Sequence, residues 1–310
     1  MPELPEVQTT VSGLQKVLPK LSIKDVWTDF EKMFHSIAFS KFKKEILNKK
    51  VISIKRRAKN ILINLSGNKT VLIHMKMTGH LMVGYYKKTY DLQPTTNKKK
   101  KEVWIPHEKE KNEALRNPFN RFIHAVFTLS NGKHLVFCDT RKFGKIALIE
   151  TDKLLHSPHL AHLGPEPLPK NFTYKIFRER IFKRQNTKIK TALMDQTVIS
   201  GIGNIYSDEI LFHSGVNPEE RVRNLPEKLL QKVFRAIKPA LKGGIHFGGD
   251  STSDYRNVDG KKGKFQNKHM AYRKTGKPCQ KHQCKGVILR KIVNGRSAHF
   301  CSKHQKLLCS

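Results

Sequence analysis

The feature that most constrains the fold of this 310-residue chain is a change in the spacing of its apolar residues. Val7, Val11, Leu14 and Leu18 recur at helical spacing, which predicts an amphipathic helix over residues 5–18. The next hundred residues instead contain short β-branched and aromatic segments between Gly, Asn and Ser, which predict strands around 51–65, 70–83, 122–129, 134–138 and 144–149. We therefore expect a sheet-rich N-terminal domain with a flanking helix.

Helical spacing returns in the second half of the chain, after a proline-containing segment at 153–173 that predicts a linker. Helices are expected at 174–184, 188–195, 204–213 and 226–242, with Asn204 and Asn224 as caps, Gly215 as a stop and Pro239 as a kink or early end. The last forty residues are again β-like. The predicted domains are 1–152, 174–262 and 263–310, and the polar stretch 85–117, with its lysines at 98–101, is predicted to be a solvated insertion loop without chemistry.

The charge of the chain indicates a polyanionic partner. It has 60 Lys and Arg against 25 Asp and Glu, a formal net charge of +35, and such a surplus is typical of nucleic-acid-binding proteins. A generally basic proteome or an acidic membrane surface are the alternatives. No apolar run is long enough to span a bilayer and no export signal is visible. The expected location is the cytoplasm, in association with the nucleoid.

Cysteine usage favours a metal site over disulfides. Four of the five cysteines lie in the last 32 residues, at Cys279, Cys284, Cys301 and Cys309, while Cys138 stands alone. An odd, clustered count in a chain without an export signal argues against a disulfide framework.

The first residues could supply a nucleophile. Pro2 follows the initiator methionine, whose removal would expose a secondary α-amine. An α-amine titrates near 7.7–8.0, so about a third is neutral near pH 7.5, compared with about 0.1% for a lysine. Glu3 and Glu6 place carboxylates beside it for proton transfer. On these residues alone, an ordinary helix start rich in Pro and Glu is the better interpretation.

Six segments, beginning with these first residues, decide between these interpretations. Residues 1–7 read Met-Pro-Glu-Leu-Pro-Glu-Val, and the segments at 56–59, 74–79, 139–144, 162–168 and 201–206 follow in order. Together with the terminal cysteines, this series resembles bacterial formamidopyrimidine-DNA glycosylases over essentially the whole chain except 85–117. The resemblance implies an α+β fold with an N-terminal β-sandwich, a helix–two-turn–helix domain and a β-hairpin zinc finger. It also implies a monomer that acts on damaged double-stranded DNA.

The resemblance assigns chemistry to four residues. Pro2 would attack the sugar C1′, Glu3 would donate a proton, and Lys59 would transfer protons and bind phosphate. Arg296, at the tip of a hairpin with a type I′ Asn-Gly turn, would contact phosphate and assist the final elimination. The implied activity is excision of oxidised purines (8-oxoguanine and formamidopyrimidines) followed by β,δ-elimination.

Other residues are implied to hold the DNA. Glu6 would bind the sugar of the damaged nucleotide, and Met77, Arg141 and Phe143 would fill the space that the extruded base leaves. Lys190, Asn204 with the backbone N–H groups of its helix start, and His124 would contact the DNA backbone. The chain departs from the family at Met75-Lys76, where Leu-Gly is usual, and at Phe122, where a first histidine is usual.

The terminal cysteines are expected to bind one structural Zn²⁺. The family has two Cys-x2-Cys pairs, whereas here Cys284 follows Cys279 at x4 and His304 follows Cys301 at x2. The predicted ligands are Cys279, Cys284, Cys301 and His304, an accepted tetrahedral set. His282 is the alternative to Cys284, and a finger without metal is the other alternative.

Two alternative functions remain at this point. An endonuclease VIII-like glycosylase would prefer oxidised pyrimidines, but that branch typically has Gly where Leu4 stands. A noncatalytic zinc-finger DNA-binding protein would need none of Pro2, Glu3, Glu6 and Lys59.

Overall fold

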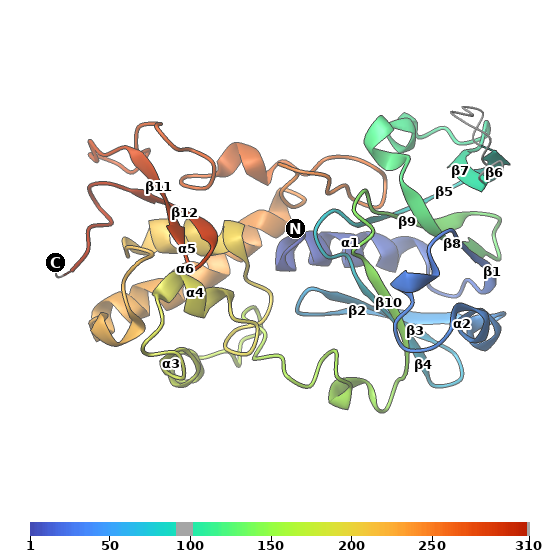
Figure 1. Ribbon diagram of the computed structural model, residues 1–310, viewed down its shortest axis with the longest axis horizontal. Helices are drawn as coiled ribbons and strands as arrows, with labels where there is room; N and C mark the ends of the chain where they lie inside the picture. The colour runs from blue at the N-terminus through green and yellow to red at the C-terminus, as the bar shows by residue number, and fades with distance from the viewer. Residues whose placement is uncertain (91–101, 309–310) are drawn as a thin grey trace. The chain divides into compact units, whose positions relative to one another are not determined.

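Strands dominate the first half of the chain and helices the second in the computed structural model, which describes residues 1–90 and 102–308 (Figure 1). The chain divides into two units. Unit 1 contains Met1–Pro2, Glu6–Ser157 and Gly248–Gly263, and unit 2 contains Glu3–Pro5, Pro158–Phe247 and the chain from Lys264 onward. Among the described residues, no helix is both long and apolar enough to cross a membrane.

Unit 1 is a β-sandwich. Its two antiparallel four-stranded sheets have the orders β1-β8-β9-β5 and β10-β4-β3-β2 (Figure 1). The strands are β1 (Ile23–Thr28), β2 (Val51–Arg57), β3 (Asn60–Leu65), β4 (Lys69–His74), β5 (His80–Gly84), β8 (Ile123–Leu129), β9 (His134–Cys138) and β10 (Lys145–Glu150). Buried side chains from both sheets form one core. The segments predicted as strands are confirmed, although 51–65 and 70–83 each contain two strands.

Two helices pack on this core. The helix predicted over 5–18 is confirmed as α1 (Leu4–Val17), and its apolar stripe is at most 1% exposed at Val7, Val11 and Leu14. α2 (Phe39–Ile46) contributes Phe42 and Ile46 to the same core. The short 3₁₀ turns of unit 1 are η1 (Glu31–Met33), η2 (Glu113–Arg116), η3 (Pro118–Asn120) and η4 (Leu154–His156).

The prediction of a solvated loop at 85–117 is wrong for the described part of that stretch. β6 (Tyr86–Tyr90) and β7 (Glu102–Pro106) form a hairpin, and η2 follows it. Tyr86 and Leu115 are buried in a second small core with Met82 and Val136. The burial of these two side chains anchors the stretch on unit 1. The sequence did not predict this, because few of the apolar residues in the stretch stand at a recognisable period. The lysines at 98–101 lie outside the described residues.

Unit 2 contains the four predicted helices, α3 (Tyr174–Phe182), α4 (Ile189–Met194), α5 (Asn204–Ser214) and α6 (Glu227–His246), and the 3₁₀ turns η5 (Val222–Asn224) and η6 (Phe265–Lys268). Gly215 ends α5 as predicted, but Gly203 and Pro226, not Asn204 and Asn224, are the N-caps of α5 and α6. α6 also continues past Pro239, because this exposed proline stands beside Ile237 and Leu241, whose complete burial holds the helix on the core.

The C-terminal hairpin is confirmed. β11 (Ile288–Val293) pairs with β12 (Arg296–Cys301), and Asn294 and Gly295 between them both have positive φ, at 45° and 72°. Two consecutive positive φ angles define the predicted type I′ turn.

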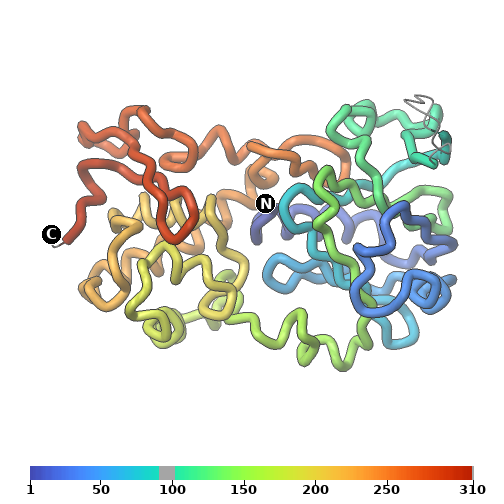
Figure 2. Tube along the Cα trace, viewed as in Figure 1, coloured from blue at the N-terminus to red at the C-terminus, as the bar shows by residue number. Residues whose placement is uncertain are grey.

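Residues 248–263 differ from the predicted domain division, which placed them with the helices. In the structure they belong to unit 1, where Val258 joins the core of the sandwich. Figure 2 shows this orange segment beside green segments of unit 1.

Candidate functional site

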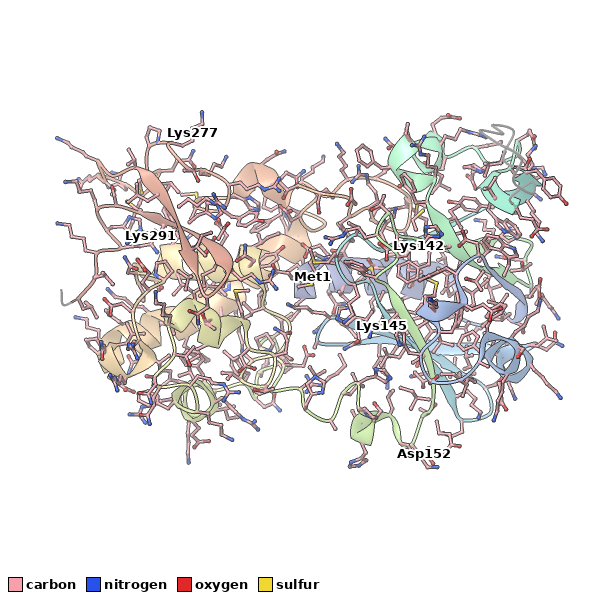
Figure 3. All side chains as sticks on the ribbon, in the orientation of Figure 1. Met1, Lys142, Lys145, Asp152, Lys277 and Lys291 are labelled. Atoms are coloured by element: carbon pink, nitrogen blue, oxygen red, sulfur yellow. The ribbon has the colours of Figure 1, made fainter. Side chains whose placement is uncertain are left out.

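The first residues are held differently from one another. Met1 is 41% exposed and Pro2 is buried (Figure 3). While Met1 is present, the Pro2 nitrogen belongs to a peptide bond and has no lone pair available for attack. Removal of Met1 is therefore a precondition for any nucleophilic role of Pro2.

The Glu3 carboxylate caps helix α5. It is 2% exposed and accepts hydrogen bonds from the backbone N–H groups of Gly203 (2.7 Å), Ile205 (2.8 Å) and Tyr206 (3.4 Å). These are the N–H groups that the sequence analysis assigned to a DNA phosphate, and Glu3 engages them instead. A carboxylate at a helix N-terminus is stabilised by the free N–H groups and by the helix dipole. Glu3 is therefore fixed in one position.

Asn204 and Lys190 lie near this helix start in different environments. The Oδ1 atom of Asn204 is buried and has no hydrogen-bond partner within the described part of the chain. Lys190 is completely buried, and its Nζ atom pairs with Asp208 and donates to Ser207 Oγ (3.2 Å) and Asn204 O (3.3 Å). Lys190 cannot present its charge to DNA, so the predicted phosphate contact is corrected: this lysine joins α4 to α5.

Glu6 lies in the first turn of α1 and is 1% exposed. Its Oε1 atom accepts a hydrogen bond of 2.8 Å from the backbone N–H of Asp250. Its backbone oxygen accepts one of 3.0 Å from the Tyr255 hydroxyl. Glu6 is therefore held by the segment 248–263 of unit 1.

Lys59 lies in the turn between β2 and β3, near His74 at the end of β4. Lys59 is 6% exposed and directly precedes Asn60, which pairs with His74 across β3 and β4. Burial, followed by the charges of Lys76 and Lys59, lowers the pKa of His74 to about 3. The neutral ring accepts from the Lys76 backbone N–H at Nδ1 (2.9 Å), so its proton is assigned to Nε2. His74 is a neutral donor next to Lys59, and the sequence analysis did not single it out.

Met77, Arg141 and Phe143 form an exposed apolar and cationic group. Met77 is 36% and Phe143 48% exposed, and the Arg141 guanidinium lies 4.5 Å from the centre of the Phe143 ring. Met77 and Phe143 line a cavity of about 450 Å³, whose walls also include Phe30, Lys32, Lys76, Lys142 and Lys145. The three residues that were predicted to act together are thus brought together.

Asp139 organises the turns that carry this group, and it was missed from the sequence. Its fully buried carboxylate accepts from the backbone N–H groups of Arg141 (3.2 Å) and Gly144 (2.7 Å) and from the Thr78 hydroxyl. Because Thr78 follows Met77, one carboxylate fixes both turns.

His124 and Arg296 have opposite exposures. His124 is 6% exposed and its Nδ1 atom lies 2.7 Å from Asp29 Oδ1, so its ring is oriented by that carboxylate. Arg296 is exposed at the first position of β12, beside the hairpin turn, as predicted.

Four C-terminal side chains converge into a group that could hold a metal ion. The ligand atoms of Cys279, Cys284, Cys301 and His304 all lie within 4.8 Å of one another. The Sγ atoms of Cys284 and Cys301 are 3.5 Å apart, and Cys279 Sγ is 3.5 Å from His304 Nδ1. A tetrahedral site with metal–sulfur bonds of ~2.3 Å requires separations of roughly 3.8 Å. His304 Nε2 lies 3.2 Å from Phe212 O, which orients the ring. The residues fit a metal, and the group includes Cys284 in preference to the exposed His282.

Comparison with known proteins identifies the family. The formamidopyrimidine-DNA glycosylase N-terminal domain matches residues 1–146, and the formamidopyrimidine-DNA glycosylase H2TH domain matches residues 163–256. The chain belongs to the formamidopyrimidine-DNA glycosylase family.

Full-length relatives agree. The chain is 36% identical over 307 residues to the formamidopyrimidine-DNA glycosylase of Pelotomaculum thermopropionicum, with 99% of this chain and all of the relative covered. The enzyme of Heliobacterium modesticaldum is 35% identical over 306 residues, with the same coverage. Among solved structures, a Lactococcus lactis Fpg mutant bound to DNA that contains Fapy-dG has a TM-score of 0.82 at 30% identity, and covers 99% of this chain and all of its own.

As a member of this family, the chain belongs to the DNA-repair glycosylases. The fold of each unit agrees with the fold expected from the sequence, namely a β-sandwich in unit 1 and helices with a hairpin finger in unit 2. In unit 1 the buried Asp139 carboxylate holds the turns that carry Met77, Arg141 and Phe143, and in unit 2 the buried Glu3 carboxylate caps the helix start that carries Asn204. A signal for Asp139 existed in the sequence, because it opens the segment 139–144 that carries Arg141 and Phe143.

Proposed function

We propose that this protein excises oxidised purines, 8-oxoguanine and formamidopyrimidines, from double-stranded DNA and then cleaves the strand at the resulting abasic site. The observation that carries the proposal is the N-terminal Met-Pro-Glu segment of a family member, in which Glu3 is immobilised next to the amine that removal of Met1 would create. A fixed carboxylate beside a partly neutral α-amine combines a nucleophile with a proton donor and acceptor.

The proposed reaction begins with attack of the Pro2 nitrogen lone pair on the sugar C1′ of the damaged nucleotide. The glycosidic C–N bond breaks, its electron pair leaves with the base, and Glu3 supplies a proton to the departing base or to the sugar ring oxygen. The Pro2 nitrogen then releases its N–H proton, and its lone pair forms a C=N bond to C1′ as the C1′–O4′ bond of the sugar ring breaks and O4′ takes up a proton. The product is a ring-opened iminium between Pro2 and C1′.

The iminium makes the strand-cleaving steps possible. It withdraws electrons and acidifies C2′–H, so loss of that proton expels the 3′ phosphate by β-elimination. Loss of the C4′ proton then expels the 5′ phosphate by δ-elimination. Lys59 serves in proton transfer and phosphate binding, and Arg296 binds the phosphate that leaves last. Water hydrolyses the remaining imine and frees Pro2.

DNA binding is proposed to use side chains of both units. Met77, Arg141 and Phe143 would fill the vacated base stack, since apolar side chains suit an unstacked step and a guanidinium can hydrogen-bond the orphaned base. Glu6 would hold the sugar, and Asn204, His124 and the neutral donor His74 would contact the backbone. Solved complexes of Lactococcus lactis Fpg contain DNA with an abasic site and DNA with Fapy-dG, which supports this partner.

The metal is proposed to be one structural Zn²⁺. The four protein ligands would fill a tetrahedral site and leave no position for substrate, so the ion would stabilise the finger that carries Arg296.

An endonuclease VIII-like preference for oxidised pyrimidines is the second candidate. Leu4 and the pair of Arg141 and Phe143 favour the purine branch by their resemblance. Duplexes that each contain one defined lesion distinguish the two substrate preferences. If the protein excised dihydrothymine and left 8-oxoguanine intact, oxidised pyrimidines and not oxidised purines would be its substrates.

Borohydride trapping tests the nucleophile. Mature protein without Met1 should form a covalent adduct with an 8-oxoguanine duplex, because borohydride reduces the iminium to a stable amine. Pro2→Gly replaces the secondary α-amine of the proline ring with a primary α-amine and should trap much less. Protein that retains Met1 should not trap at all, and efficient trapping by that form would exclude Pro2 as the nucleophile.

A further inference from the structure

The turn η2 with its cap Asn112, together with η3, contacts the segment that holds Glu6. Residues 248–263 bind Glu6 through the Asp250 N–H (2.8 Å to Oε1) and the Tyr255 hydroxyl (3.0 Å to the backbone oxygen). The same segment lies against η2 and η3, all within unit 1. No role in the reaction has been given to these turns so far.

Two asparagine side chains bind the backbone of this segment. Asn112 donates from Nδ2 to Asp259 O at 2.9 Å, and Asn120 donates from Nδ2 to Gly260 O at 3.4 Å. Gly260 has φ +75°, and a Cβ atom there would lie 2.9 Å from both Ala114 O and Asn120 Nδ2. The two backbones are therefore packed as closely as glycine permits.

An arginine connects the turns to Tyr255. Arg256 is only 1% exposed, and its guanidinium lies 5.0 Å from the centre of the Phe119 ring. Its Nη1 atom donates to Tyr255 O at 2.8 Å and to Ser253 O at 3.2 Å. Burial of a guanidinium has a large desolvation free energy, and a cation–π contact offsets part of it. Phe119, Arg256 and Tyr255 thus form a chain of contacts that ends at Glu6.

The opposite face of the segment is also held. Val83 of β5 donates its backbone N–H to Val258 O at 2.9 Å, and Val258 is buried in the sandwich core. The segment therefore lies between the sandwich and the turns 112–120, and it can shift only if one of these contacts opens.

We propose that the turns 112–120 are a brace that fixes residues 249–260 against Glu6 and so positions this carboxylate for the reaction. The proposal rests on the sugar-binding role given to Glu6 under the proposed function. Asn112 and Phe119 are positioning residues: they touch neither the substrate nor the reacting atoms. A displacement of about 1 Å in a group that orients substrate can cost a large factor in rate without weakening binding.

Two pairs of variants test the brace. Asn112→Asp keeps the oxygen that caps η2 at the Ala114 N–H but loses the donor to Asp259 O. Its matched control is Asn117→Asp, which makes the same change at the cap of η3. Phe119→Ala removes the ring beside Arg256, while Phe119→Tyr retains it; Phe119 is 49% exposed, so truncation is tolerated by the fold.

Three quantities are measured on each mature variant. The first is the single-turnover rate of 8-oxoguanine excision, and the second is the dissociation constant for an uncleavable lesion duplex. The third is amide hydrogen exchange at residues 249–256, which needs no activity. Asn112→Asp and Phe119→Ala should lose on the order of tenfold in rate, exchange faster at the Asp250 amide and bind duplex as wild type does. Asn117→Asp and Phe119→Tyr should match wild type.

The outcomes test the brace separately from the proposed excision of oxidised purines. Unchanged exchange at 249–256 in both damaging variants, or equal losses in Asn117→Asp, would overturn the brace. Faster exchange with an unchanged excision rate would confirm the contact but exclude its role in positioning. A wild-type protein that excises nothing would refute the proposed function, while the exchange data would still decide whether the brace exists.

Discussion

Lys76 shows how a single residue can combine backbone strain with a binding role. Its φ is +54°, in the left-handed region that favours glycine, and glycine is usual here in the proteins that the chain resembles. Its side chain lines the cavity beside Met77, and burial together with the charge of Lys145 lowers its pKa. A cation kept in a strained and partly desolvated position is well placed to meet a phosphate.

Lys76→Gly should therefore separate stability from binding. Glycine relieves the left-handed strain, so the free energy of unfolding should rise by about 1 kcal/mol. Loss of one cation should weaken duplex binding and reduce the slope of log K against log salt by about 1. Thermal unfolding and binding titrations at several salt concentrations measure the two effects. Lys16→Gln, at an exposed position in the last turn of α1, is the control. An unchanged salt slope in Lys76→Gly would remove Lys76 from the interface.

At the scale of elements, a buried ionic network joins α4, α5 and β12. Lys190 pairs with Asp208, whose Oδ2 accepts from the backbone N–H of His299 at 3.0 Å and lies 2.8 Å from its ring nitrogen Nδ1. The two side chains of the lysine–aspartate pair are at most 1% exposed. This network attaches the β11–β12 hairpin, which carries Arg296, to the helices of unit 2.

Lys190→Met should destabilise the protein without changing its contact with phosphates. Removal of one partner leaves the Asp208 carboxylate buried and uncompensated, at a cost of about 3–5 kcal/mol. Denaturant unfolding measures this loss. Salt titrations of the folded variant should give the wild-type slope, because Lys190 does not reach the surface. A slope lower by about 1 would restore the phosphate contact that the sequence suggested.

The C-terminal hairpin and its Cys/His cluster lead to a second prediction, which concerns the metal ligands. Cys284→Ser should lower the metal content of the purified protein and weaken duplex affinity, because the hairpin depends on the ion. His282→Ala should keep one metal per chain, since His282 lies outside the cluster. His304→Cys should also keep it, as a Cys₄ site. Elemental analysis gives the metal's identity and stoichiometry. If Cys284→Ser kept its full metal content and lost the metal only when His282 was also replaced, His282 and not Cys284 would be the ligand.

Local pattern predicted most elements but not their long-range contacts. α1, the helices of unit 2 and the C-terminal hairpin follow from apolar spacing and turn residues, which act over a few positions. The capping of α5 by Glu3 joins residues 200 positions apart, and the burial of Lys190 depends on Asp208 across two helices. Neither leaves a local signal. The β6–β7 hairpin was missed because its core residues, Tyr86 and Leu115, are separated by a long polar sequence.

At the scale of the whole molecule, the surplus of 35 positive charges makes solvent conditions part of the function. Figure 3 shows side chains with nitrogen tips projecting from both units. Such a surplus repels itself in the free protein and is relieved when a polyanion binds. It also makes further protonation unfavourable, which matters for histidines that are already buried.

Acid should destabilise unit 1 before its carboxylates titrate. The pKa of His74 is lowered to about 3, mainly by burial and then by the nearby lysines, and burial lowers that of His80 to about 4. Both values lie below the ~6.5 of an unfolded histidine, so the unfolded chain binds more protons between pH 4 and 6.5. The contribution of the two neutral histidines to the free energy of unfolding is therefore fully present above pH 6.5. It falls as the pH decreases, by roughly 2 kcal/mol for each histidine at pH 5.

Urea unfolding at several pH values measures this loss, and fluorescence reports on unit 1 alone because both tryptophans, Trp27 and Trp104, lie there. His80→Gln removes one titrating group and keeps a donor for Asn120 Oδ1, which the ring nitrogen Nε2 contacts at 3.0 Å. It should reduce the proton uptake on unfolding between pH 5 and 6.5 by about one. If wild type and His80→Gln lose stability in parallel over that range, the pKa of His80 is the same in the folded and the unfolded protein, and its burial does not keep it neutral.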